Sequence, residues 1–153
     1  AGKSSLFNHL VGSARALVSD RPGTTRDVVE RSVLLDGMDI TFLDTAGEGG
    51  TDDQLEQAGV ALGQSLSAQA DLRVVVVPSD RPLCMASRGL IDRTRDQRHL
   101  LVGTFGDRPR DPEFDLTDLV VDNVTGLGVN AVNAAVRSAV ANAPTYCFST
   151  TSE

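Results

Sequence analysis

The chain carries the sequence AGKSSLFNHLVG at residues 1–12, in which Gly-Lys-Ser stands at the start of a helix predicted for residues 3–11. A glycine lets the backbone approach a phosphate group, and the unpaired N–H groups at a helix start point toward it. Lys3 then reaches the β- and γ-phosphate oxygens, and the Ser4 hydroxyl group can bind Mg²⁺. The tripeptide alone is a weak signal, so its neighbours decide. Gly2, Lys3, Ser4 and Ser5 are the first candidate nucleotide-binding residues.

The second motif is Asp44-Thr45-Ala46-Gly47, at the end of an apolar strand predicted for residues 38–43. A carboxylate at the carboxyl end of a strand can support Mg²⁺, and the amide of a following glycine can meet a γ-phosphate. Asp-x-x-Gly is also a common strand-to-turn sequence. Its position about 40 residues after Gly-Lys-Ser, beyond a hairpin, favours the nucleotide interpretation, with Asp44 as a magnesium ligand and Gly47 at the phosphate.

Between these motifs lies Pro-Gly-Thr-Thr-Arg-Asp at residues 22–27. A hydroxyl group in such a loop can complete the magnesium shell when the loop closes over the nucleotide. Thr24 and Thr25 are the candidates, with Thr25 as the magnesium ligand. In isolation a polar surface loop would be the better interpretation, and the order of the three motifs reverses that preference.

Apolar runs and helical patterns alternate along the chain. Residues 28–35 and 38–43 flank an Asp-Gly turn signal and predict a hairpin, and residues 72–77 contain the valine run of a strand buried on both faces. Further strands are predicted for residues 100–102 and 119–121, and helices for residues 54–70, 87–97 and 129–141. This order predicts a three-layer α/β domain of the P-loop NTPase type, with a mostly parallel central sheet and one antiparallel hairpin strand.

The composition indicates a globular domain, with 41% hydrophobic and 23% charged residues and a formal charge of −7. The negative charge argues against nucleic-acid binding by this segment alone, because phosphate binding needs clustered Lys and Arg. Cys84 and Cys147 have no metal-ligand spacing and predict buried or idle thiols of a reducing compartment, with a disulfide as the less favoured alternative. No apolar run reaches membrane-spanning length and no secretory signal is visible, so the prediction is a cytoplasmic protein without a membrane partner.

With these motifs in place, the chain resembles the translation-factor-related GTPases, and most of all the G domains of the MnmE (TrmE) family of tRNA modification GTPases, within the TrmE-Era-EngA-like P-loop group. The matching stretches are GKSSLFNHLVG, ALVSDRPGTTRDVV, LLDGMDITFLDTAG and DDQLEQAGV. The ribosome-assembly GTPase family Der (EngA) resembles the chain at GTTRD and DTAG. The E-x-x-G formed by Glu56 and Gly59 favours the MnmE type.

The resemblance implies a GTPase that depends on Mg²⁺ and is stimulated by K⁺, with G domains that form a homodimer across their nucleotide faces. Backbone carbonyl groups of Ser19 and Arg21, in the switch loop, correspond to potassium ligands. Glu56 corresponds to the catalytic glutamate that orients the attacking water, and Lys3 assists at the phosphate. The resemblance also implies tRNA and a modification enzyme as partners, through regions outside this chain, in the modification of the wobble uridine.

The base-reading segment departs from the family pattern of Asn/Thr-Lys-x-Asp. Thr104 fits its first position and Asp107 its last, where it could accept hydrogen bonds from guanine, but Phe105 replaces the lysine. The ring of Phe105 could stack on the base instead. The last recognition loop, VDNVTG at residues 121–126, is altered as well. Glu48, directly after DTAG, is interpreted as a surface carboxylate, with a second water-positioning group as the alternative.

The phosphate loop lacks its first glycine and preceding strand here, so we expect residues 1–153 to be a single G domain that starts inside that loop and belongs to a longer protein. The prediction is a GTP-binding and GTP-hydrolysing domain of a tRNA modification GTPase, releasing GDP and phosphate. The alternatives are a Der-like ribosome-assembly GTPase and a degenerate G domain that acts as an interaction module.

Overall fold

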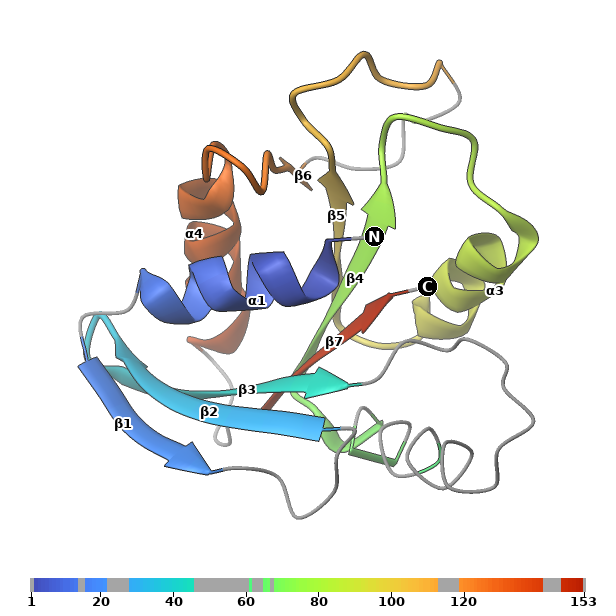
Figure 1. Ribbon diagram of the computed structural model, residues 1–153. Coiled ribbons are helices and arrows are strands. Elements are labelled where there is room, and N and C mark those ends of the chain that lie inside the picture. Colours follow the sequence, from blue (N-terminus) through green and yellow to red (C-terminus); the bar gives the residue numbers. More distant parts are fainter. Residues whose placement is uncertain are drawn as a thin grey trace.

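Seven strands form one sheet with helices on both faces (Figure 1). The computed structural model describes residues 2–13, 16–21, 28–45, 61, 65–66, 68–112, 119–141 and 147–152. The strands are β1 (Ala16–Arg21), β2 (Val28–Leu35), β3 (Met38–Thr45), β4 (Leu72–Pro78), β5 (His99–Thr104), β6 (Leu119–Val120) and β7 (Cys147–Ser152), and the helices are α1 (Lys3–Gly12), α3 (Met85–Thr94) and α4 (Val129–Val140).

The hairpin of β2 and β3 forms as predicted from its turn signal. Asp36 and Gly37 both have positive φ, at 49° and 83°, which is the conformation of a tight two-residue hairpin turn. Strand pairing runs from Leu35 opposite Met38 to Val28 opposite Thr45. The hairpin therefore carries Asp44 to the far end of β3.

The strand order is β1-β2-β3-β7-β4-β5-β6. β2 is antiparallel to both of its neighbours, whereas β3, β7, β4, β5 and β6 are parallel to one another. The predicted fold class, a mostly parallel sheet with one antiparallel hairpin strand, is confirmed. Parallel strands end at the same edge of a sheet, so the carboxyl ends of β3, β4, β5 and β6 lie along one edge.

The sequence did not predict β1 or β7. β1 lies at the edge of the sheet and its pairing with β2 shifts register between Leu17 and Ser19. β7 lies between β3 and β4, although its sequence CFSTTS lacks the apolar run of a central strand. Backbone pairing on both sides holds β7 in this position.

The core lies on both faces of the sheet, because successive side chains of β4 point to opposite faces. Val74 and Val76 belong to the larger apolar cluster with the buried side chains of α1 and α4, whereas Val75 and Val77 pack with Leu90 of α3. Helices α1 and α4 therefore cover one face of the sheet and α3 covers the other, which gives the predicted three layers (Figure 1).

The helix boundaries are close to the predicted ones for α1 and α4. α3 starts at Met85 and ends at Thr94, instead of spanning residues 87–97. Cys84 caps its first turn, because the sulfur atom accepts a hydrogen bond from the backbone N–H of Ser87 at 3.4 Å. Of the helix predicted for residues 54–70, the structure describes residues 61, 65–66 and 68–70, and all but residue 70 are helical. No described helix is long and apolar enough to span a membrane.

Phe42 of β3 tests this packing, because it is fully buried and its ring meets that of Phe7 edge-on at 6.3 Å. We expect Phe42→Ala to lower the free energy of unfolding by about 3–5 kcal/mol, since it leaves a cavity between α1 and the sheet. Met85→Ala is the control: Met85 is 89% exposed, so its effect stays within about 0.5 kcal/mol. Urea denaturation measures both, and equal effects would contradict the described core.

Candidate nucleotide-binding site

The first part of the site lies where α1 begins, beside the end of β3. Gly2 precedes the helix with φ at 80°, and its carbonyl group accepts the N–H of Leu6 at 3.0 Å. Lys3 is only 8% exposed. Its ammonium group lies 2.9 Å from Oδ1 of Asp44, so the structure joins the first and second sequence motifs.

This arrangement is suited to an anion. A helix start presents unpaired backbone N–H groups with a partial positive charge, and Lys3 adds a full charge. Because a buried charge is costly without a partner, Asp44 balances Lys3 in this state. A phosphate group could take the place of that carboxylate on Lys3 and leave Asp44 to a cation.

The donor chemistry of the described residues also fits Mg²⁺, which the GTPase class requires. The ion prefers oxygen ligands and is usually held by one or two carboxylates or hydroxyl groups together with substrate phosphates and water. Asp44 offers a carboxylate, and Ser4, which is exposed beside Lys3, offers a hydroxyl oxygen.

The second part of the site is the segment after β5, predicted to read the base. Thr104 is fully buried and its hydroxyl group donates to the carbonyl of Val77 at 3.4 Å. A Cβ atom built on Gly2 would lie 3.5 Å from Cγ2 of Thr104. The structure therefore brings this segment against the start of α1. Asp107 is exposed two residues beyond Phe105.

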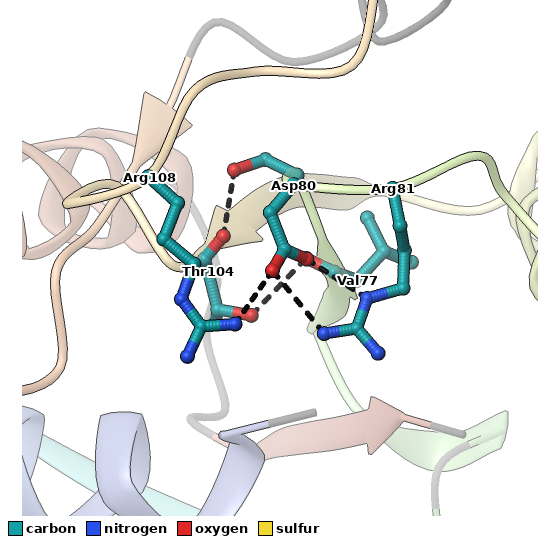
Figure 2. A network of polar contacts seen from close by, with 6 residues as sticks. Val77, Asp80, Arg81, Thr104 and Arg108 are labelled. Carbon is teal, nitrogen blue, oxygen red and sulfur yellow. Dashed lines mark hydrogen bonds and ion pairs between the residues drawn. The ribbon is translucent and has the colours of Figure 1, made fainter.

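A polar cluster after β4 supports this segment (Figure 2). Asp80 binds Arg81 through Nε at 2.9 Å and Nη2 at 3.2 Å, and Arg108 through Nη1 at 2.8 Å. The hydroxyl group of the neighbouring Ser79 donates to the carbonyl of Thr104 at 2.6 Å. These contacts tie the loops after β4 and β5 together at the carboxyl edge of the sheet.

Phe105 lies over this cluster in an unusual backbone conformation. Its φ is 62°, which a residue with a side chain adopts rarely and mostly at functional sites. The guanidinium carbons of Arg108 and Arg81 lie 4.7 and 5.5 Å from the centre of its ring, within cation–π distance. The ring thus already has cationic partners from the protein. A base that stacks on Phe105, as predicted, would have to share the ring with these arginines or displace them.

The same cluster controls the ionisation of Asp80. Its hydrogen bonds to Arg81, followed by those to Arg108, lower the pKa of the carboxyl group from 3.8 to about 2, against the opposing effect of burial. The bond to Asp80 in turn raises the pKa of Arg81. Asp80 therefore stays a carboxylate at any physiological pH.

Two predicted site residues lie in a strand, and others fall outside the described part of the chain. Ser19 and Arg21 belong to the edge strand β1, paired with Ser32 and Glu30, and not to a loop as predicted. Because β1 pairs with β2, the antiparallel part of the sheet includes both positions. Thr24, Thr25, Gly47, Glu48 and Glu56 lie outside the described residues.

Sequence reasoning did not find Asp80, Arg81 or Arg108 as parts of the site. Residues 80 and 81 lie two and three positions after the end of the valine strand, which places them at the edge where ligands bind in parallel sheets. That position was the available signal, but the pairing of Asp80 with Arg108, 28 residues later, depends on the tertiary fold.

A glycine-lysine-serine helix start, a carboxylate at the end of the adjacent strand and polar loops at the same edge of a parallel sheet define a P-loop nucleotide-binding domain. Residues 1–104 match the family model described as "50S ribosome-binding GTPase". The chain belongs to this family of GTPase domains.

Its curated relatives include proteins named tRNA modification GTPase MnmE. The protein from Natranaerobius thermophilus is 35% identical over 131 residues, which is 86% of this chain and 29% of the relative. The protein from Thermus thermophilus is 40% identical over 149 residues, with 92% and 31% covered. The chain thus spans less than a third of the length of these relatives.

Among solved structures, the G domain of the T. maritima FeoB iron transporter has a TM-score of 0.60 and 24% sequence identity, and the match covers 91% of each chain. This likeness shows that the G-domain fold is shared.

Acid unfolding tests the role of Asp80. Because its pKa is lower in the folded state, the carboxylate stabilises the fold fully above its unfolded value of about 4, and this contribution disappears as the pH falls through about 2. We expect Asp80→Asn to be less stable than the wild type at pH 7, with a gap that narrows below pH 4. Urea denaturation between about pH 2 and 7 measures this; a constant gap over that range would contradict it.

Proposed function

We propose that this domain binds GTP with Mg²⁺ at the junction of α1 and β3 and hydrolyses it as the G domain of a tRNA modification GTPase. The observation that carries the proposal is the contact of 2.9 Å between Lys3 and Asp44. It brings together a cation for the phosphate and a carboxylate for the metal from two motifs 41 positions apart. The similarity to MnmE proteins over most of the chain supports the biological assignment.

The phosphate end is assigned to the following residues. Gly2, Lys3 and the backbone of Ser4 and Ser5 bind the phosphate oxygens, as helix-start amides do in other nucleotide sites. Bound Mg²⁺ supplies charge neutralisation for the phosphates. Its ligands are the hydroxyl groups of Ser4 and Thr25, with Asp44 in support, while Thr24 and the amide of Gly47 contact the nucleotide.

Catalysis rests on positioning water and stabilising the negative charge that spreads over the transferred phosphoryl group. Glu56 orients the attacking water indirectly, in line with the E-x-x-G resemblance. Backbone carbonyl groups near Ser19 and Arg21 would hold K⁺, and the bound ion would supply positive charge for the phosphates. A homodimer formed across the nucleotide faces would enclose this region and exclude bulk water.

The base end supports a weakened preference for guanine. Thr104 and Asp107 keep the first and last positions of the base-reading segment, and Asp107 is exposed and can accept hydrogen bonds from guanine N1 and N2. Phe105 replaces the lysine and contacts Arg81 and Arg108. We expect discrimination against ATP to depend chiefly on Asp107.

The biological target is tRNA, at the wobble uridine, in the cytoplasm. The formal charge of −7 argues that RNA and the partner modification enzyme contact other regions of a longer protein. A Der-like role in ribosome assembly would use the same chemistry at this site and would differ in its target.

Replacement of Glu56 tests the catalytic assignment. We expect Glu56→Ala to reduce GTP turnover in KCl by at least about 100-fold, since water is no longer oriented, while GTP binding is unchanged. The matched control is Glu48→Ala, which removes a nearby carboxylate interpreted as a surface group and should keep wild-type turnover. Phosphate release and fluorescent-nucleotide titration give the two readouts.

Unchanged turnover in Glu56→Ala would contradict the role of this residue, and equal rates in KCl and NaCl would contradict the role of K⁺. Titration with GTP, GDP and ATP analogues distinguishes a nucleotide-binding domain from the alternative, a degenerate G domain that acts as an interaction module. Binding of none of the three by the full-length protein would favour that module.

A further inference from the structure

The loop between β6 and α4, residues 121–128, is tied to α1 by one residue. The side-chain amide of Asn123 donates from Nδ2 to the carbonyl oxygen of Gly2 at 2.9 Å. The backbone carbonyl of Asn123 lies 2.8 Å from Nε2 of His9, which donates to it. Asn123 therefore contacts the residue that precedes α1 and, about two turns later, His9 within the helix.

The fit at the start of the helix is close. A Cβ atom built on Gly2 would lie 2.4 Å from Nδ2 of Asn123, so a larger residue than glycine would displace the amide. Thr104 also lies beside Gly2, since its Cγ2 atom would be 3.5 Å from the same built Cβ atom. Three segments meet here: the phosphate-binding helix start, the end of β5 and the 121–128 loop.

Hydrogen bonds within the 121–128 loop fix the position of Asn123. Asp122 is 5% exposed and accepts the backbone N–H of Val124 at 2.8 Å and the hydroxyl group of Thr125. These bonds, with that of Thr125 the strongest, lower the pKa of Asp122 and keep it ionised. The backbone N–H of Asp122 also donates to Leu127, and that of Gly126 to Asp122.

The amide of Asn123 makes this contact at a cost to folding. Its Oδ1 atom is buried and has no hydrogen-bond partner among the described residues. An unpaired buried amide oxygen costs at least as much as one hydrogen bond contributes on balance. The contact to Gly2 therefore contributes little net stability, and its position beside the phosphate-binding helix start is what distinguishes Asn123.

We propose that Asn123 is a positioning residue that fastens the Gly2 carbonyl to the 121–128 loop and thereby orients the phosphate-binding start of α1 relative to the base-binding end of the site. This inference rests on the proposed function, because it concerns the same nucleotide. Fixing Gly2 fixes the amide of Lys3 that follows it. Loss of the bond leaves the helix start less well ordered for phosphate.

The test compares two asparagines that both bind α1. Asn133 of α4 donates to the hydroxyl group of Ser13 at 2.6 Å, beyond the other end of α1, and its buried Oδ1 also lacks a partner among the described residues. Asn133→Ala thus removes the same chemistry away from the site. Asn123→Ala removes the proposed contact, and Asn123→Asp replaces the donor with an acceptor of the same shape.

We expect both Asn123 variants to bind GTP and GDP about 5- to 100-fold more weakly than the wild type, which is the usual range for coupling between two parts of a site. Asn133→Ala keeps wild-type affinity. The melting temperature of Asn123→Ala stays within about 2 °C of the wild type, because one unfavourable and one favourable contribution are lost together. Fluorescent-nucleotide titration and thermal unfolding of the full-length protein provide the data.

Wild-type affinity in both Asn123 variants would overturn the inference and leave the proposed function intact. An equal loss of affinity in Asn133→Ala, or a fall in melting temperature that accounts for the weaker binding, would also overturn it, since the role of Asn123 would then be structural. Absence of nucleotide binding by the wild-type protein would instead refute the proposed function itself.

Discussion

A buried positive charge at the start of α1 requires a partner, and the contact between Lys3 and Asp44 satisfies this requirement. Helix α1 packs against the sheet through the buried side chains of Leu6, Phe7 and Leu10. Lys3, at the start of this helix, therefore has little access to water. The β2–β3 hairpin brings Asp44 to the same place. The fold therefore holds together two groups that a nucleotide and its magnesium ion would separate.

The rest of the site follows from the direction of the strands. Because β4, β5 and β6 run parallel to β3, their loops converge on the edge where α1 begins. Asp80 with its two arginines joins the loops after β4 and β5, and Asn123 joins the loop after β6 to Gly2. The phosphate end of the proposed site thus carries a lysine paired with a carboxylate, whereas the base end carries Phe105 with its two arginine partners.

The sequence was sufficient for features with a local signal. The Asp-Gly turn predicted the hairpin, and the valine run predicted β4, because each depends on neighbouring residues. β7 could not be predicted, since its polar sequence is held by pairing with β3 and β4. Lys3 and Asp44 were assigned to one site from motif order. The roles of Arg108 and Asn123 depend on contacts with residues 28 and 121 positions away, which no local pattern reveals.

The most direct test of the nucleotide site is a crystal structure of the full-length protein with Mg²⁺ and a non-hydrolysable GTP analogue. We expect the ammonium group of Lys3 to leave Asp44 and bind the β- and γ-phosphate oxygens, with Asp44 turned toward the magnesium ion. A structure in which the nucleotide binds elsewhere while Lys3 and Asp44 remain paired would contradict the assignment of this site.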